Sequence, residues 1–154
     1  MKLKPVFLIF LGGMLALACG AFWPAPGGNF ASNGEQIYFA AVNAKGDPIS
    51  YTGGPRFGGM MGGRLACVFC HGVGGRGGLH WMHMQQMDAP DIRYSALAQD
   101  EHEGGAMEYD LEMFRQAVVL GQHPDGDSLS PDMPRWALSD EDLADLFAYL
   151  KTLP

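Results

Sequence analysis

"LACVFCHG", residues 65–72, is the stretch on which the fold of this 154-residue chain depends. It contains two of the chain's three cysteines, Cys67 and Cys70, and His71 follows at once. Two thiols three residues apart on a tight turn reach the two vinyl groups of one porphyrin, and the adjacent histidine then lies beneath the iron. Cys-x-x-Cys-His is the attachment signature of c-type haem. A single copy of the motif predicts one haem c, bound through two thioethers.

Three other uses of a cysteine pair fit this sequence less well. A structural zinc site takes four ligands, commonly from two such pairs, and the chain has no second pair. A thioredoxin-like redox pair lies beside a strand–helix–strand pattern, which we do not find here. A plain disulfide between Cys67 and Cys70 accounts neither for His71 nor for the glycine-rich surroundings. Covalent haem is therefore the interpretation that the sequence favours.

The first 18 residues have the pattern of an export signal. Lys2 and Lys4 precede an apolar run, and small residues then lead to Cys19. We expect residues 1–18 to be a signal peptide or membrane anchor, 19–31 a linker and 32–154 the functional domain. The stretch "LALAC" is similar to a lipoprotein cleavage site at which Cys19 would receive lipid, and ordinary cleavage or a retained anchor stay open. Each of these outcomes exports the domain, to the periplasm or to the outer face of a membrane.

The second axial position of the iron separates electron carriers from catalysts and gas sensors. The downstream candidates are methionines and histidines: Met82, Met84, Met87, Met107, Met113, Met133, His80, His83, His102 and His123. Met133 lies in "SLSPDMPRW", a loop that Pro131 and Pro134 stiffen, and a rigid loop can hold a thioether against iron. We predict Met133 as the ligand, with His80 or His83 as the alternative. The cluster "HWMHMQQMDAP" at 80–90 suits an apolar haem edge better than a copper site.

Three amphipathic stretches predict the main helices. The first begins near Ser32 or Asn33 and includes "GEQIYFAAV", and the middle one follows Asp110 as "LEMFRQAVVLG" and stops at Gly121. The last opens at Ser139 with three acidic residues in its first turn, and it ends at Lys151. We therefore expect an all-α fold with three main helices around the haem. A glycine-rich insertion, residues 43–66, separates the first helix from the haem motif.

The order of helix, haem motif, middle helix, methionine loop and terminal helix resembles class I cytochrome c over roughly residues 30–154, and in particular the monohaem bacterial domains. In that family a glycine and an aromatic residue on the first helix cross a leucine and an aromatic residue on the last. Gly34 with Tyr38, and Leu146 with Tyr149, match that pattern. Four-helix-bundle cytochromes differ, because their haem motif lies close to the C-terminus.

The resemblance implies a ligand set and a function. Cys67, Cys70, His71 and Met133 would bind the cofactor, with His71 and Met133 on the iron. Iron with both axial positions filled has no site for substrate, so the protein would not be an enzyme. It would transfer single electrons between periplasmic or membrane-associated redox partners, or within a membrane redox complex. The alternative is a peroxidase-like enzyme or a gas sensor with an open or labile sixth position.

The remaining expectations concern the haem surroundings and the surface. We expect the pocket walls from Leu65, Val68, Phe114, Trp136 and Leu138, and propionate contacts from Arg135 or Arg64 and from the Trp136 indole. Asp91 and Arg93 would pair on the surface, and the haem edge near the two cysteines would be exposed. A formal net charge of −7 excludes nucleic acid as a partner and suits a basic redox protein.

Overall fold

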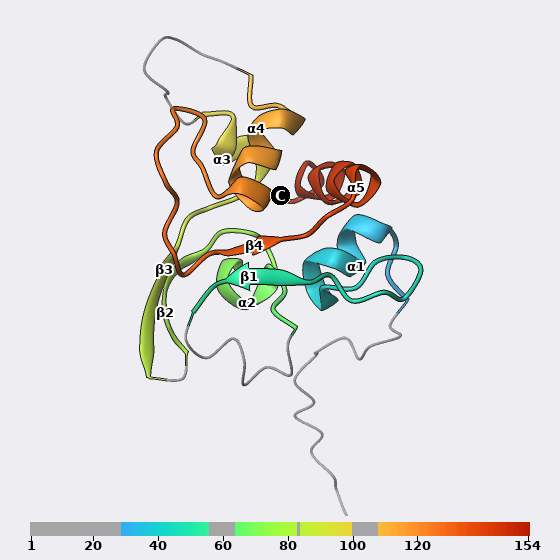
Figure 1. The fold of residues 1–154 in the computed structure, drawn as a ribbon, viewed down its shortest axis with the longest axis horizontal. Coiled ribbons are helices and arrows are strands. Elements are labelled where there is room, and N and C mark those ends of the chain that lie inside the picture. Colours follow the sequence, from blue (N-terminus) through green and yellow to red (C-terminus); the bar gives the residue numbers. More distant parts are fainter. Residues whose placement is uncertain (1–28, 56–63, 83, 100–107) are drawn as a thin grey trace, which may run out of the picture.

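The structure is a computed structural model that describes residues 29–55, 64–82, 84–99 and 108–154. The predicted signal segment 1–18 lies outside the described residues, as does most of the linker. The helices, shown in Figure 1, are α1 (Asn33–Ala40), α2 (Val68–His71), α3 (Tyr94–Leu97), α4 (Leu111–Arg115) with its π-helical continuation η2 (Gln116–Leu120), and α5 (Asp140–Leu150). None of the helices in this part of the chain combines the length and the apolarity needed to cross a membrane.

The predicted starts of the first and last helices and the predicted end of the middle helix agree with the structure, whereas α1 ends at Ala40 and not at the predicted Val42. The Ser32 hydroxyl accepts a hydrogen bond from the Glu35 N–H, and the Ser139 hydroxyl accepts one from Asp142, so both serines are N-caps. Gly121 ends the middle helix in the left-handed conformation, with φ of 71°. Side-chain caps and a C-terminal glycine act locally, which is why the sequence locates these ends.

Two small antiparallel sheets and the additional short helices α2 and α3 correct the expectation of an all-α fold with three main helices. Strand β1 (Tyr51–Gly53) pairs with β4 (Pro134–Trp136), and β2 (Gly78–Met82) pairs with β3 (Gln85–Ala89). These strands are three to five residues long, too short for a clear alternation of apolar and polar residues. Strand β1 lies in the segment 43–66, which the sequence predicted as a glycine-rich insertion and of which residues 56–63 are outside the described part.

Helices α1 and α5 cross at the residues that the family resemblance indicates (Figure 1). A Cβ atom built on Gly34 would lie 2.0 Å from the Asp145 carbonyl oxygen, so only glycine allows this close approach. The rings of Tyr38 and Tyr149 lie 5.3 Å apart beside the crossing. Leu146 is buried next to them. The crossing predicted from these residues is confirmed.

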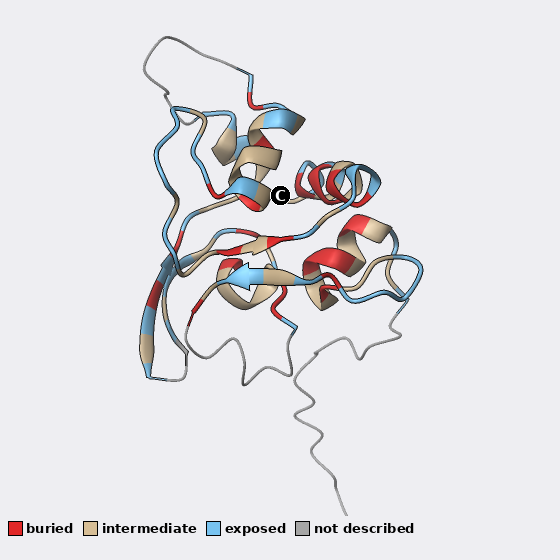
Figure 2. Cartoon of the chain, in the orientation of Figure 1, coloured by how far each residue is buried: buried red, intermediate tan, exposed pale blue. Residues whose placement is uncertain are grey.

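The core lies between α1, α4, η2 and α5, and their inward faces are buried in Figure 2. Its buried side chains are mainly large and apolar: Ile37, Tyr38, Ile49, Tyr109, Phe114, Val118, Trp136, Leu143, Leu146, Phe147 and Leu150. Because close-packed apolar side chains exclude water, this core forms one wall of the site described next.

Candidate functional site

The motif residues lie on one short helix. Cys67 is the residue before α2, and Cys70 and His71 are its last two residues. The His71 N–H donates to the Cys67 carbonyl over 2.9 Å, which closes one helical turn between them. Both cysteines are free thiols. The turn therefore presents two thiols and one imidazole from neighbouring positions, as the spacing predicts.

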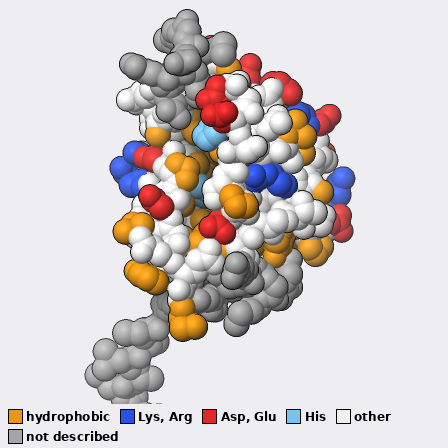
Figure 3. All heavy atoms as spheres, turned by 60° about the vertical axis from the view of Figure 1, so that its left-hand side comes forward, with side chains coloured by type: hydrophobic (Ala, Val, Ile, Leu, Met, Phe, Trp, Pro, Cys, Tyr) orange, Lys and Arg blue, Asp and Glu red, His pale blue; other side chains and the backbone are white. Residues whose placement is uncertain are grey.

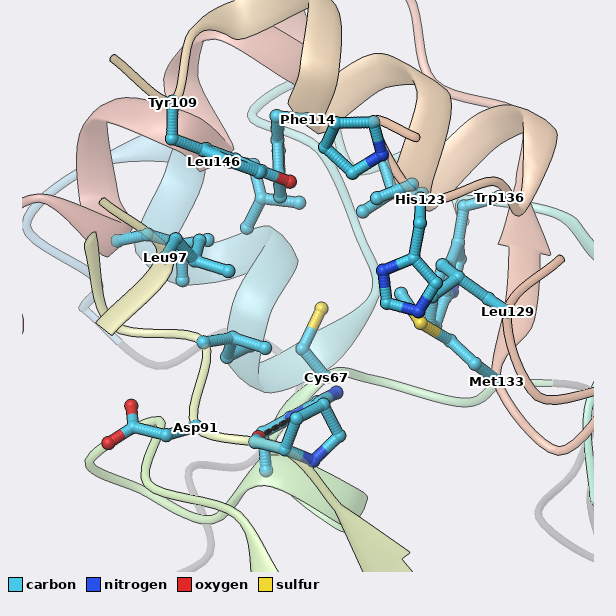
Figure 4. Close-up of a pocket in the computed structure, with 17 residues that line it drawn as sticks. Cys67, Asp91, Leu97, Tyr109, Phe114, His123, Leu129, Met133, Trp136 and Leu146 are labelled. Atoms are coloured by element: carbon cyan, nitrogen blue, oxygen red, sulfur yellow. Dashed lines mark hydrogen bonds between the residues drawn. The ribbon is translucent and has the colours of Figure 1, made fainter. Parts of the chain in front are cut away.

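The orientation of His71 leaves one ring nitrogen available as a ligand. Its Nδ1 lies 2.9 Å from the Pro90 carbonyl oxygen, the bond drawn dashed in Figure 4. A carbonyl only accepts hydrogen bonds, so Nδ1 bears the proton and Nε2 keeps its lone pair. Burial lowers the pKa of His71, although the bond to Pro90 acts in the opposite direction. The imidazole is therefore neutral at physiological pH.

Two adjoining cavities of about 120 and 270 Å³ open beside this helix, and Cys67, His71 and Met133 line both. The smaller cavity is bounded mainly by apolar residues of the core. The larger cavity is lined by Cys70 and by residues of β3. Leu65, Phe114 and Trp136 line them as predicted, whereas Val68 and Leu138 pack against the core instead. The smaller cavity is also lined by residues that were not predicted as pocket walls: Pro90, Ile92, Leu97, Tyr109, Ala117, Val118, Leu129, Leu146 and Leu150.

The loop that contains Met133 is fixed by pairing with β1. Pro134 is opposite Gly53 in the β1–β4 register, and the Gly54 N–H donates to the Pro131 carbonyl over 3.1 Å. Met133 itself closes a turn by donating its N–H to Ser130 over 3.1 Å. Strand β1, from the segment 43–66, thus positions the strand that follows Met133.

Arg135 also stabilises the Met133 loop, through hydrogen bonds to its main-chain carbonyls. Its guanidinium donates to the main-chain carbonyls of Met133 and Pro134, and to Leu129 and Ser130 over 3.2 and 3.4 Å. It also lies against Gly121, where a Cβ atom would be 1.5 Å from Nε. The arginine therefore ties the end of η2 to the Met133 loop.

The polar groups expected to contact propionates are engaged elsewhere. Trp136 donates its single indole N–H to the Leu65 carbonyl over 3.0 Å, so the propionate role predicted for it is wrong. The guanidinium of Arg135 donates to loop carbonyls through Nη1 and Nη2, and the propionate role expected for it stays a prediction. Arg64 is exposed and stays a prediction. The expected pair of Asp91 and Arg93 is present, at 2.6 Å.

A family model for cytochrome c matches residues 31–154. The chain belongs to the cytochrome c family. Comparison with curated proteins and with solved structures gives no further match. Membership identifies a haem protein of the electron-transfer type, in which the haem is covalently bound.

The residues of this cytochrome fit a covalently bound haem. Burial raises the pKa of Cys67 to about 12, and burial followed by the charge of Asp132 raises that of Cys70. Both sulfurs therefore keep their protons, and a thiol supplies the sulfur and the hydrogen that addition across a vinyl double bond needs. His71 presents a free lone pair from a buried position, and the cavity walls are mostly apolar.

The other methionines and histidines that the sequence offered as iron ligands lie at separate places in this cytochrome. Met113 packs against the core, and Met84 is 95% exposed at the tip of the β2–β3 hairpin. Met87 is buried and lines the larger cavity, in keeping with a filler of the haem edge rather than a copper ligand. His80 lines neither cavity, whereas His123 lines both. Met107, His83, His102 and the side chain of Met82 lie outside the described residues.

Proposed function

We propose that the protein is a monohaem cytochrome that transfers single electrons between redox proteins, with His71 and Met133 as the axial ligands. The observation that supports this most strongly is that His71 on α2 and Met133 on the distal loop line the same two cavities. Two ligands from opposite elements leave no position for substrate. Bound haem supplies a ferric–ferrous couple, and a thioether ligand raises its potential.

The residues of the chain contribute rigidity to this role. Pro90 fixes the ring of His71, while β1 and Arg135 hold the loop of Met133. Apolar walls keep water from the iron, which limits the reorganisation that accompanies a change of charge. Electron transfer favours a site whose geometry changes little between its two oxidation states.

The export of the protein is part of the proposal. The pattern of residues 1–18 supports a signal or anchor, and "LALAC" supports lipid on Cys19. With 19–31 as a tether, the domain would work beside a membrane redox complex or as its subunit. Mass spectrometry of the membrane-extracted protein tests this, because a chain that begins at an acylated Cys19 supports the lipid anchor. A mature N-terminus elsewhere with unmodified Cys19 would exclude it.

A visible spectrum of the dithionite-reduced protein, before and after carbon monoxide, tests the function itself. We expect a c-type spectrum that carbon monoxide leaves unchanged, because both axial positions are filled. A shift of the main band would instead show an accessible iron and favour the peroxidase-like or gas-binding alternative. Intact mass of the same sample counts the haems, and we expect one.

A further inference from the structure

The distal side of the site contains a second side chain that can ligate iron. His123 lines both cavities, as Met133 does. In Figure 4 the imidazole of His123 and the thioether of Met133 lie beside one another, across the cavity from Cys67. A neutral imidazole is a common ligand of haem iron. The proposed electron-transfer function uses Met133 and gives His123 no role.

The position of His123 follows from a closed loop. The His123 N–H donates to the Asp127 carbonyl over 2.7 Å, and its own carbonyl accepts from Gly126 over 2.9 Å. A bridge between Gln122 and Ser128 closes the loop next to it. The backbone of His123 is therefore fixed, while the residue is exposed to solvent and lines both cavities.

Arg135 contacts both segments that carry the two candidate iron ligands, His123 and Met133. Arg135 lies against Gly121, two residues before His123, and donates to the carbonyl of Met133. The Leu129 N–H also donates to the Gly121 carbonyl over 2.9 Å, which joins the two ends of the loop. His123 and Met133 consequently belong to one hydrogen-bonded unit on the side of the cavities away from α2.

The other described histidines do not compete for this position. His71 belongs to the motif helix, and its Nδ1 is bonded to Pro90. His80 has its Nδ1 at 3.1 Å from the Gly78 carbonyl and lines neither cavity. Within residues 29–55, 64–82, 84–99 and 108–154, His123 is the histidine that the fold places at the distal side.

We propose that His123 is a second distal ligand, which replaces Met133 when the thioether leaves the iron. This rests on the proposed electron-transfer function. In such an exchange one iron–sulfur bond would break and one iron–nitrogen bond would form, with the lone pair of an imidazole nitrogen of His123 taking the place of that of the sulfur. No electron or proton is consumed. Since the thioether favours ferrous iron, oxidation shifts the balance toward His123, and the iron stays closed to outside ligands in both states.

Spectra of variants test this proposal. Met133→Leu removes the thioether and keeps an apolar side chain in the loop, and Met133→Ala is a second variant if the leucine disturbs haem attachment. We expect the ferric form of either to stay low-spin, because His123 completes the coordination. Adding His123→Gln should convert it to high-spin. Adding His80→Gln instead is the matched control and should leave it low-spin.

Carbon monoxide kinetics give an independent measurement on the ferrous variants. In Met133→Leu the rate of binding should become independent of carbon monoxide concentration, because departure of His123 limits it. In the double variant with His123→Gln, the rate should rise in proportion to concentration. A high-spin single variant, or a double variant that stays low-spin, would overturn the role of His123. Carbon monoxide binding by the unaltered protein would instead contradict the proposed function.

Discussion

At the scale of single residues, Trp136 joins the two halves of the haem site. Its indole N–H lies in β4, three residues after Met133, and donates to the carbonyl of Leu65 just before the motif. Both residues are buried, at 7% and 1% exposure. A buried carbonyl that loses its donor keeps its full desolvation penalty. This one bond therefore connects the distal loop to the motif segment.

Replacing Trp136 by phenylalanine tests that connection. We expect Trp136→Phe to lower the free energy of unfolding by about 1–3 kcal/mol, because the Leu65 carbonyl stays buried without its donor. Denaturant unfolding measures it. Trp81→Phe is the matched control, since Trp81 is 70% exposed, and it should change stability by less than about 0.5 kcal/mol. Equal losses in the two variants would contradict the assignment.

Asp142 is a buried carboxyl whose ionised form the fold stabilises. Burial would raise its pKa, but hydrogen bonds from Asn33, at 3.0 Å, and from Ser139, at 2.7 Å, outweigh this and hold the pKa below the ordinary value. A carboxyl with a depressed pKa in the folded state contributes stability above its unfolded pKa. That contribution disappears as the pH falls through the folded pKa.

Measuring the free energy of unfolding as the pH is lowered tests the direction of this effect. We expect Asp142→Asn to cost roughly 1 kcal/mol near neutral pH and progressively less below about pH 4, where the unaltered protein also loses the charge. Glu141→Gln, an exposed position in the same helical turn, is the control and should not show this acid-side convergence. A penalty that stays constant with pH would mean that packing rather than charge explains the effect.

At the scale of elements, the crossing of α1 and α5 supports the haem motif as well as the core. The Tyr38 hydroxyl on α1 donates to the Gly72 carbonyl over 2.5 Å, immediately after His71. Gly34 sets how closely α1 approaches α5, and so it sets where Tyr38 lies. A displaced α1 would withdraw this hydrogen bond from the end of α2.

Gly34→Ala tests whether the crossing of α1 and α5 requires their close approach at this residue. The added Cβ would overlap the Asp145 carbonyl, so we expect a loss of about 2–3 kcal/mol in the free energy of unfolding. Gly74→Ala is the matched control, because a Cβ there meets nothing within 4 Å and its φ is not positive. If both alanines were tolerated equally, the close approach would not determine the crossing.

Arg135 acts on a second element, the loop before β4. We expect Arg135→Lys to release Met133 from iron more readily, because an ammonium cannot reach several carbonyls at once as a planar guanidinium does. The thioether–iron absorption in the far red should disappear at lower denaturant, corresponding to roughly 1–3 kcal/mol. Arg115→Lys, whose partners are the exposed Glu112 and Asp140, should leave the absorption unchanged.

At the scale of the whole molecule, charge and exposed apolar groups meet near the haem site. Asp88 and Asp132 line the larger cavity and Asp91 the smaller. On the β2–β3 hairpin, Leu79 and Trp81 are 65% and 70% exposed. Figure 3 shows acidic and apolar side chains interspersed on the face where the hairpin side of the molecule comes forward. With a net charge of −7, such a surface should attract cations toward the haem edge.

The salt dependence of electron transfer tests this attraction without a known partner. We expect tris(1,10-phenanthroline)cobalt(III), a cation, to oxidise the ferrous protein more slowly as ionic strength rises, because salt screens the attraction. Ferricyanide, an anion, should react faster as the repulsion is screened. Stopped-flow spectroscopy measures both. Identical salt dependence for the two oxidants would show that the protein's charge does not act at the site of electron exit.

The sequence by itself determined the features that adjacent residues encode. The spacing of Cys67, Cys70 and His71 specifies one helical turn, and the helix ends at Ser32, Ser139 and Gly121 need only side chains or conformations within one turn. The methionine of a proline-stiffened loop could be proposed as a ligand for the same reason. The family follows from the order of these local features, and the match over residues 31–154 confirms it.

Only the tertiary structure decided how distant segments combine. That Pro90 orients His71 could not be read from the chain, because every residue offers a main-chain carbonyl. The same holds for Arg135, whose partners are carbonyls, and for β1, which pairs with a strand some eighty residues away along the chain. Met133 and His123 were both candidates in the sequence. Their place on one side of the cavities depends on a loop closed by hydrogen bonds between backbone atoms, and residue identity does not specify those bonds.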